Sequence, residues 1–252
     1  MTLTDIPERH MTSQVNRSVQ IEMLLVVIAI GGFCATAAIL IEQHFGFPSL
    51  GPLALLAVIG AVSVERIGSY HPYQRLGWAN VTTFLRGGIV VLFSAPLCAA
   101  SDGVLTNTEA WFAAGIAVLA LALDGVDGFI ARKQRLASSF GARLDMELDA
   151  LFILLLAGLA WQNGKAGAWI LVLGIMRYAF VAAGQFFPAL NMALPPSLRR
   201  KVVCVVQVGV LILLLLPFVN PPFSQLFAAV ALASLLWSFT VDIAWQIRNH
   251  PS

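Results

Sequence analysis

The segment from Ala110 to Trp161 reads AWFAAGIAVLALALDGVDGFIARKQRLASSFGARLDMELDALFILLLAGLAW. It contains two apolar runs, 110–130 and 144–161, joined by a short basic stretch. Each run is close to the roughly 20 residues that a helix needs to cross a bilayer, and far longer than an ordinary strand. The segment therefore predicts a membrane-spanning helical hairpin that carries aspartates beside its basic connection.

Similar apolar runs occupy most of the remaining chain, at 23–41, 50–64, 83–100, 167–187, 202–218 and 225–246. Apolar residues make up 59% of the 252 positions and charged residues only 11%, which is too little charge to cover a soluble surface. We therefore predict an all-α integral membrane protein with about eight transmembrane helices. The small net charge of +2 argues against a nucleic-acid partner.

The distribution of basic residues predicts an orientation in the membrane. Residues 1–21 are polar and of mixed charge, as expected for an N-terminal tail. If this tail is cytoplasmic, nearly all lysines and arginines fall in cytoplasmic segments. The exceptions are Lys165, on the opposite side of the membrane, and Arg177, within an apolar run. The positive-inside rule therefore predicts that both termini, and the aspartate-bearing end of the hairpin, face the cytoplasm.

Four aspartates gather at that end of the hairpin: Asp124, Asp127, Asp145 and Asp149. Spacings of three and four residues place each pair on one helical face. Carboxylates repel one another and are costly inside a membrane, so a positive group must compensate them. Oxygen ligands without a matching Cys or His set suit Mg²⁺ or Mn²⁺. The alternative is a network of ion pairs with the basic connection, which would serve one or two of the carboxylates.

Small residues accompany the aspartates. Gly128 and Ala131 each lie four residues after an aspartate, and Gly141 lies four residues before one. Small side chains would let a bulky ligand approach this face of the hairpin. Close packing of helices through small residues is the alternative interpretation.

Eight residues of the hairpin follow one spacing pattern: Asp124-x2-Asp127-Gly128-x2-Ala131-Arg132-x8-Gly141-x3-Asp145-x3-Asp149. This pattern resembles the signature of the CDP-alcohol phosphatidyltransferase family. A weaker match, Asn80-x2-Thr83-x2-Arg86, resembles the family motif at the start of the first core helix. Ala79 stands where many members of the family have proline.

The resemblance implies a fold and a reaction. It implies a six-helix catalytic core over 80–252, preceded by two additional helices and a cytoplasmic linker over 22–79. Such enzymes transfer a phosphatidyl group from CDP-diacylglycerol to an alcohol and release CMP, in phospholipid biosynthesis. The implied partners are the CDP-linked lipid donor, a small alcohol acceptor and membrane lipids, and the implied assembly is a homodimer.

The resemblance also assigns roles to residues. Asp124, Asp127 and Asp145 would hold one Mg²⁺ or Mn²⁺ ion, and Asp149 would help to hold a second ion and act as general base. The substrate-binding residues would be Asn80, Thr83, Arg86, Gly128, Ala131, Arg132, Ser138 and Gly141. A hydroxyl at Ser138 would reach phosphate, or else Ser138 is an ordinary loop residue.

The acceptor is the least determined part of the prediction. Arg177, in the middle of an apolar run, and Lys201 are candidates to bind an anionic group on the acceptor. Arg177 could instead pair with an aspartate, and Lys201 could serve only as a topology signal. Asp242 and Glu22, near helix ends, are expected to face solvent.

Two other functions stay open at this stage. One is the reverse transfer, from CDP-choline or CDP-ethanolamine to diacylglycerol. The other is a cation-coupled transporter, although transporter sites typically lie at the bilayer midplane on broken helices. Glycerol phosphate, inositol or its phosphate, serine and choline are all compatible acceptors.

Overall fold

The computed structural model describes the backbone of residues 5–70, 76–99, 103–134, 139–192, 194–195 and 197–249. It describes their side chains except at 5–16, 68–70, 126–134, 139, 188 and 191. Within these residues every regular element is helical and no strand occurs, which confirms the predicted all-α class. The chain divides into two compact units, Met1–Ala100 with Val118–Leu148, and Ser101–Ala117 with Asp149–Ser252.

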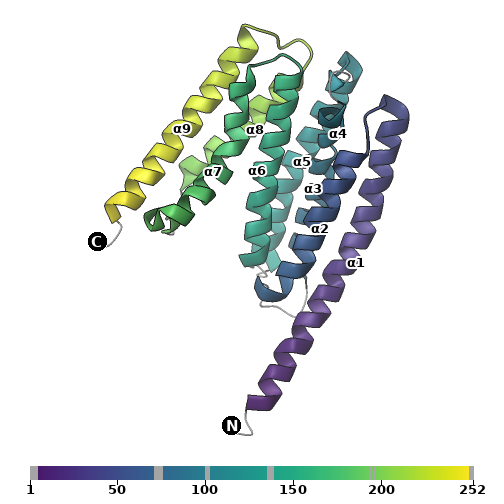
Figure 1. The fold of residues 1–252 in the computed structure, drawn as a ribbon, viewed down its shortest axis with the longest axis vertical. Coiled ribbons are helices and arrows are strands. Elements are labelled where there is room, and N and C mark those ends of the chain that lie inside the picture. The colour runs from purple at the N-terminus through teal and green to yellow at the C-terminus, as the bar shows by residue number, and fades with distance from the viewer. Residues whose placement is uncertain are drawn as a thin grey trace. The chain divides into compact units, whose positions relative to one another are not determined.

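The first unit is built on a helical pair. Its elements are α1 (Asp5–Phe45), α2 (Leu50–Tyr70), α3 (Trp78–Val91), α4 (Ser94–Cys98) and parts of α5 (Asn107–Gln134) and α6 (Ser139–Gln162). α1 and α2 lie side by side, and α3 packs against both (Figure 1). The core of this unit consists of Val19, Met23, Ile67, Leu76, Phe84 and Phe140.

α1 is longer than the first apolar run. It begins at Asp5 and has 41 residues, so most of the polar N-terminal segment is helical. Pro7 lies in the first turn, where the missing N–H costs no intrahelical hydrogen bond. The helix ends where Gly46 adopts a φ of 76°, a left-handed conformation that glycine adopts without strain.

The second unit holds the C-terminal helices. Besides the remaining parts of α5 and α6, its elements are η2 (Ala168–Leu171), α7 (Val172–Phe186), η3 (Pro188–Asn191), α8 (Leu198–Leu215) and α9 (Phe223–Asn249). α8 and α9 are neighbours (Figure 1). Fully buried leucines and isoleucines from α6, η2 and α8 form its core, among them Leu156, Leu159, Ile170, Leu211 and Leu214.

Lys165 joins two turns of the second unit. Its Nζ donates to Val219 O at 2.8 Å, to Asn220 Oδ1 at 3.0 Å and to Leu216 O at 3.3 Å. In return, the Ser224 hydroxyl donates to the carbonyl oxygen of Lys165 at 2.6 Å. Burial lowers the pKa of the Lys165 ammonium from its ordinary value. The lysine therefore supplies hydrogen bonds to carbonyl groups that follow the end of α8.

Six helical segments among the described residues are long and apolar enough to cross a membrane: Arg17–Phe45, Leu50–Ile67, Trp78–Cys98, Asn107–Gly125, Ala168–Phe186 and Phe223–Asn249. Large apolar side chains point outward from them, as Ile28 and Phe33 do with 62% and 66% exposure, which is typical of a surface in contact with lipid. α6 and α8 correspond to the other two predicted spans, 144–161 and 202–218. They are not among these six segments, and each carries charged residues near its start.

Gly174 sets the distance between α7 and α6. A Cβ atom on it would lie 2.5 Å from the Leu154 Cα and 2.8 Å from the Leu154 backbone N. Because backbone cannot move aside as a flexible side chain can, we expect Gly174→Ala to destabilise the protein by about 2–3 kcal/mol. Thermal unfolding in detergent would measure this as a lower Tm.

Gly209 provides the matched control for Gly174→Ala. It lies exposed on α8, and a Cβ atom there would meet nothing within 4 Å. Gly209→Ala should therefore leave the stability unchanged or raise it by up to about 1 kcal/mol, as alanine does at open helical positions. Equal Tm values for the two variants would contradict the close approach of α6 and α7.

Candidate active site

Three of the predicted aspartates lie together on α5 and α6. One carboxylate oxygen each from Asp124, Asp145 and Asp149 lies within 4.8 Å of the others, and all three side chains are half-buried. The boundary between the two units falls between Leu148 and Asp149, inside the continuous helix α6. Because α6 is continuous here and the two residues are four positions apart, Asp149 lies one helical turn from Asp145 on the same face. The predicted convergence of carboxylates is thus present for these three residues.

Arg86 of α3 lies against two of these carboxylates. Its Nη1 donates to Asp124 Oδ1, and its Nη2 donates to Asp145 Oδ1 at 2.5 Å. The arginine side chain is 3% exposed, whereas each of the two aspartate side chains is 37% exposed. A buried guanidinium that bonds two carboxylates from different helices holds α5 and α6 in a fixed register at this level.

Gly87 explains how α3 comes close enough to α6 for this contact. A Cβ atom at Gly87 would lie 2.9 Å from Leu148 Cδ2 and 3.0 Å from Leu148 Cδ1. Since glycine has no side chain, α3 packs directly over Leu148, and the neighbouring Arg86 reaches Asp145. Gly87 therefore allows the close packing that brings Arg86 to Asp145.

The arrangement of charges fits a divalent cation. Three carboxylates and one guanidinium leave a net charge of −2 within this described group. The donor atoms are all carboxylate oxygens, and their separation suits a small cation among them. These residues therefore fit the Mg²⁺ or Mn²⁺ site that the sequence predicts, and Arg86 meets part of the need for positive charge.

Asn80 and Thr83 lie on the buried side of α3. The Asn80 side-chain amide donates to Leu76 O, and the Thr83 hydroxyl donates to Ala79 O at 2.9 Å. Gly141 lies half-buried in the first turn of α6, one turn before Asp145. The structure therefore places these three residues in the unit that contains Arg86 and Asp145.

Other predicted site residues lie outside the described side chains. The backbone of α5 runs through Asp127, Gly128, Ala131 and Arg132, but the side chains at these positions are not among those described. Ser138 lies outside the described residues altogether. The predicted roles of these five residues stay predictions.

The predicted acceptor-binding residues lie in the second unit. Arg177 is half-buried on α7, and Lys201 is exposed in the first turn of α8. The neighbours of Lys201 are engaged elsewhere: Arg199 Nη2 and Arg200 Nη1 both donate to Asp242 Oδ1, at 2.6 and 3.0 Å. Of the basic cluster on α8, Lys201 is thus the member that leaves its charge in solvent.

Asp242 corrects one expectation. It does not face solvent: it is buried at 8% exposure and pairs with the two α8 arginines. Ser238 and Gln246 lie four residues to either side on α9 and are also buried. Gln246 donates to Leu190 O and Met192 O at 2.9 and 2.8 Å. Polar residues repeated every four positions on an apolar helix were the sequence signal for this inward-facing stripe.

Glu22 also differs from expectation. Its Oε2 accepts a hydrogen bond from the backbone N–H of Leu76 at 2.8 Å, and the side chain lies in the first unit at intermediate exposure. The contact ties α1 to the residue just before α3, 54 positions away. Glu22 is therefore part of the support for the helix that carries Asn80, Thr83 and Arg86.

Comparison of the sequence with known proteins points to the same part of the chain. A model of the family described as CDP-alcohol phosphatidyltransferase matches residues 76–240. This range contains Arg86 and the three clustered aspartates. Inner membrane protein YnjF of Escherichia coli strain K12 is 36% identical over 86 residues, which are 31% of this chain.

The chain spans only 38% of the length of YnjF. No solved structure matches the chain. The helices long enough to span a bilayer and the similarity to an inner membrane protein identify a multi-pass membrane protein. With the family model covering well over half of its residues, the chain belongs to the CDP-alcohol phosphatidyltransferase family of enzymes.

Proposed function

We propose that the protein transfers a phosphatidyl group from CDP-diacylglycerol to an alcohol and releases CMP, as a step of phospholipid synthesis. The observation that carries this proposal is the convergence of Asp124, Asp145 and Asp149 within the range matched by the family. A half-buried carboxylate cluster on a membrane helical hairpin suits a substrate whose diphosphate lies at the membrane interface. Transfer from a CDP-alcohol to diacylglycerol is the second candidate, because it uses the same groups.

Asp124, Asp127, Asp145 and Asp149 would hold two Mg²⁺ or Mn²⁺ ions. When bound, such ions neutralise the diphosphate and stabilise the charge that develops on the departing CMP oxygen. In this proposal Asp149 accepts the proton of the attacking hydroxyl as general base. The acceptor oxygen bonds to the phosphorus that carries diacylglycerol, and the bond from that phosphorus to CMP breaks.

The remaining motif residues would bind the donor. We assign Asn80, Thr83, Gly128 and Ala131 to the cytidine, and Arg132, with Ser138 and Gly141 beside it, to the diphosphate. Arginine suits this task because its planar group binds phosphate oxygens in pairs. For Arg86, the hydrogen bonds to Asp124 and Asp145 support a role in holding the carboxylates, in place of direct donor binding.

The acceptor, the orientation and the assembly belong to the same proposal. Arg177 and Lys201 would bind an anionic group of the acceptor. The site and both termini would face the cytoplasm, with a tail over 1–21, two additional helices over 22–79 and the catalytic core over 80–252. A homodimer is the assembly that the family resemblance favours.

The test is CMP release by the purified full chain in detergent. The assay contains CDP-diacylglycerol, Mg²⁺ or Mn²⁺, and one alcohol at a time, with glycerol phosphate, inositol, inositol phosphate, serine and choline as the panel. We expect release that requires both the metal and one of the alcohols. Release with CDP-choline or CDP-ethanolamine and diacylglycerol alone would instead establish the second candidate. No CMP release with any combination of donor and acceptor would contradict both candidate functions.

A further inference from the structure

Glu22 joins α1 to the chain just before α3. Its Oε2 accepts a hydrogen bond from the backbone N–H of Leu76 at 2.8 Å. Because α3 begins at Trp78, this N–H has no partner within the helix, and a carboxylate is a strong acceptor for it. Leu76 is also the first residue of the range that the family model matches. Glu22 therefore contacts this range from a helix that lies outside it.

Leu76 is held on several sides. Its side chain is 3% exposed and lies in the core of the first unit. Gly77, which follows it, has a φ of 78°, a conformation that residues with a Cβ atom rarely adopt. Leu76 O accepts a hydrogen bond from the side-chain amide of Asn80. The N–H and the C=O of one fixed residue therefore connect Glu22 to Asn80.

α1 contacts α3 a second time farther along. A Cβ atom at Gly88 would collide with Cys34 Sγ, so the two helices lie very close at this point. Leu76 and Gly88 are twelve residues apart in the sequence, and so are Glu22 and Cys34. The two contacts thus keep α1 and α3 in register over the stretch between them. This stretch contains the motif residues Asn80, Thr83 and Arg86.

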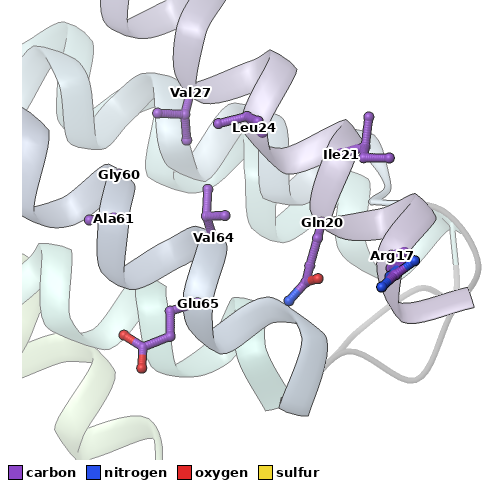
Figure 2. A pocket seen from close by; sticks show the side chains of 9 residues that line it. All are labelled: Arg17, Gln20, Ile21, Leu24, Val27, Gly60, Ala61, Val64 and Glu65. Atoms are coloured by element: carbon purple, nitrogen blue, oxygen red, sulfur yellow. The ribbon is translucent and has the colours of Figure 1, made fainter. Parts of the chain in front are cut away.

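α1 is itself fixed against α2. Figure 2 shows Val27 and Val64 between these two helices, and a Cβ atom at Gly60 would lie 2.8 Å from Val27 Cγ1. Val27 follows Glu22 by five residues, which is about 7.5 Å along the helix axis. The Glu22 carboxylate is therefore carried by a helix that close packing holds in place.

The contact with Leu76 O determines which way the Asn80 amide is turned. Only the NH₂ group of a carboxamide can donate to a carbonyl oxygen, so Nδ2 faces Leu76 and Oδ1 lies on the other side of the amide. Oδ1 is a hydrogen-bond acceptor. It suits the exocyclic amine of cytosine, whereas uracil, like thymine, has a carbonyl oxygen at that position.

We propose that Glu22 is a positioning residue for the nucleotide of the donor. Through Leu76 it holds the Asn80 amide so that Oδ1 accepts a hydrogen bond from the amine of cytosine. This inference rests on the proposed function, which assigns Asn80 to the cytidine. It gives the additional N-terminal helices a role in donor binding, because α1 carries Glu22 and α2 holds α1.

Binding of CMP and UMP to the purified full chain in detergent with Mg²⁺ tests this role. Glu22→Met keeps the size of the side chain but removes the acceptor, whereas Glu22→Gln keeps an acceptor oxygen without the charge. We expect Glu22→Met to bind CMP about tenfold more weakly than the wild type and UMP with unchanged affinity. Glu22→Gln should bind both nucleotides as the wild type does.

Glu65→Met is the matched control. Glu65 is exposed on α2, and Figure 2 shows its carboxylate directed away from α1. The control loses the same charge as Glu22→Met and should bind CMP with wild-type affinity.

Steady-state kinetics separates positioning from a general loss of structure. In Glu22→Met the KM for CDP-diacylglycerol should rise about tenfold, while kcat and the KM for the alcohol stay unchanged. Melting temperatures verify that each variant is folded, and Glu22→Ala takes the place of Glu22→Met if that variant is not.

Unchanged CMP affinity in a folded Glu22→Met variant would overturn the role of Glu22. So would equal weakening of CMP and UMP binding, or a Glu22→Gln variant as weak as Glu22→Met. Each of these results leaves the proposed function intact as long as the wild type binds CMP. A wild type that binds no CMP would contradict the proposed function and this role together.

Discussion

Replacing Asp149 with asparagine is expected to lower the rate of CMP release by about 10³-fold or more, since general bases typically contribute 10²–10⁴-fold. The substitution removes one negative charge from a group in which three carboxylate oxygens lie within 4.8 Å. It also removes the proposed acceptor for the hydroxyl proton, while the amide keeps nearly the same size. Initial rates with the best alcohol and saturating metal measure the loss.

Glu147→Gln is the matched control for Asp149→Asn. Glu147 is exposed and lies two residues from both Asp145 and Asp149, so it projects from another face of α6. The Glu147→Gln variant loses the same charge as Asp149→Asn and should keep most of the activity. A parallel Mn²⁺ titration followed by electron paramagnetic resonance separates loss of metal from loss of the base. Activity within a few-fold of wild type in Asp149→Asn would refute the role assigned to Asp149.

Arg86→Gln is expected to bind Mn²⁺ about tenfold more tightly than the wild type. The Arg86 guanidinium bonds the same carboxylates that would ligate the cation, and its charge repels a second positive group at that distance. Without metal the variant should be less stable, because the carboxylates lose their positive partner. As both aspartate side chains are 37% exposed, solvent screening limits this loss to about 2 kcal/mol, or about 5 °C in Tm.

Two measurements on one preparation test this expectation. The concentration of free Mn²⁺ during titration gives the affinity, and melting in the presence of a chelator gives the stability of the metal-free protein. Arg86→Lys keeps a charge but not the paired geometry, so its Mn²⁺ affinity should stay near that of the wild type. Weaker Mn²⁺ binding by Arg86→Gln would mean that Arg86 supports the metal-bound arrangement of the carboxylates instead of opposing it.

The carboxylate cluster could be predicted because its geometry is local. Asp145 and Asp149 are one turn apart on α6, and a short connection makes α5 and α6 neighbours. The partner of these carboxylates could not be predicted in the same way. Arg86 is 38 positions from Asp124 and 59 from Asp145, and its contact depends on how closely α3 packs at Gly87.

The same distinction holds for the fold. Hydrophobic runs predicted where the helices lie, because most of these runs are close to the roughly 20 residues that a membrane span requires. They did not predict the burial of Asp242, which depends on the position of the α8 arginines relative to α9. Nor did they predict that α1 begins at Asp5, since a polar segment joined to an apolar helix extends it without any apolar periodicity.

Lys165 has a consequence for how the second unit opens. Its ammonium donates to Leu216 O and Val219 O, and its own carbonyl oxygen accepts a hydrogen bond from the Ser224 hydroxyl. A single residue in the turn after α6 is thus hydrogen-bonded to the turn after α8. Loss of either turn would leave a buried cation and several carbonyl groups without solvation. The two turns therefore unfold as one cooperative unit, and their amide hydrogens should exchange with solvent at a common rate.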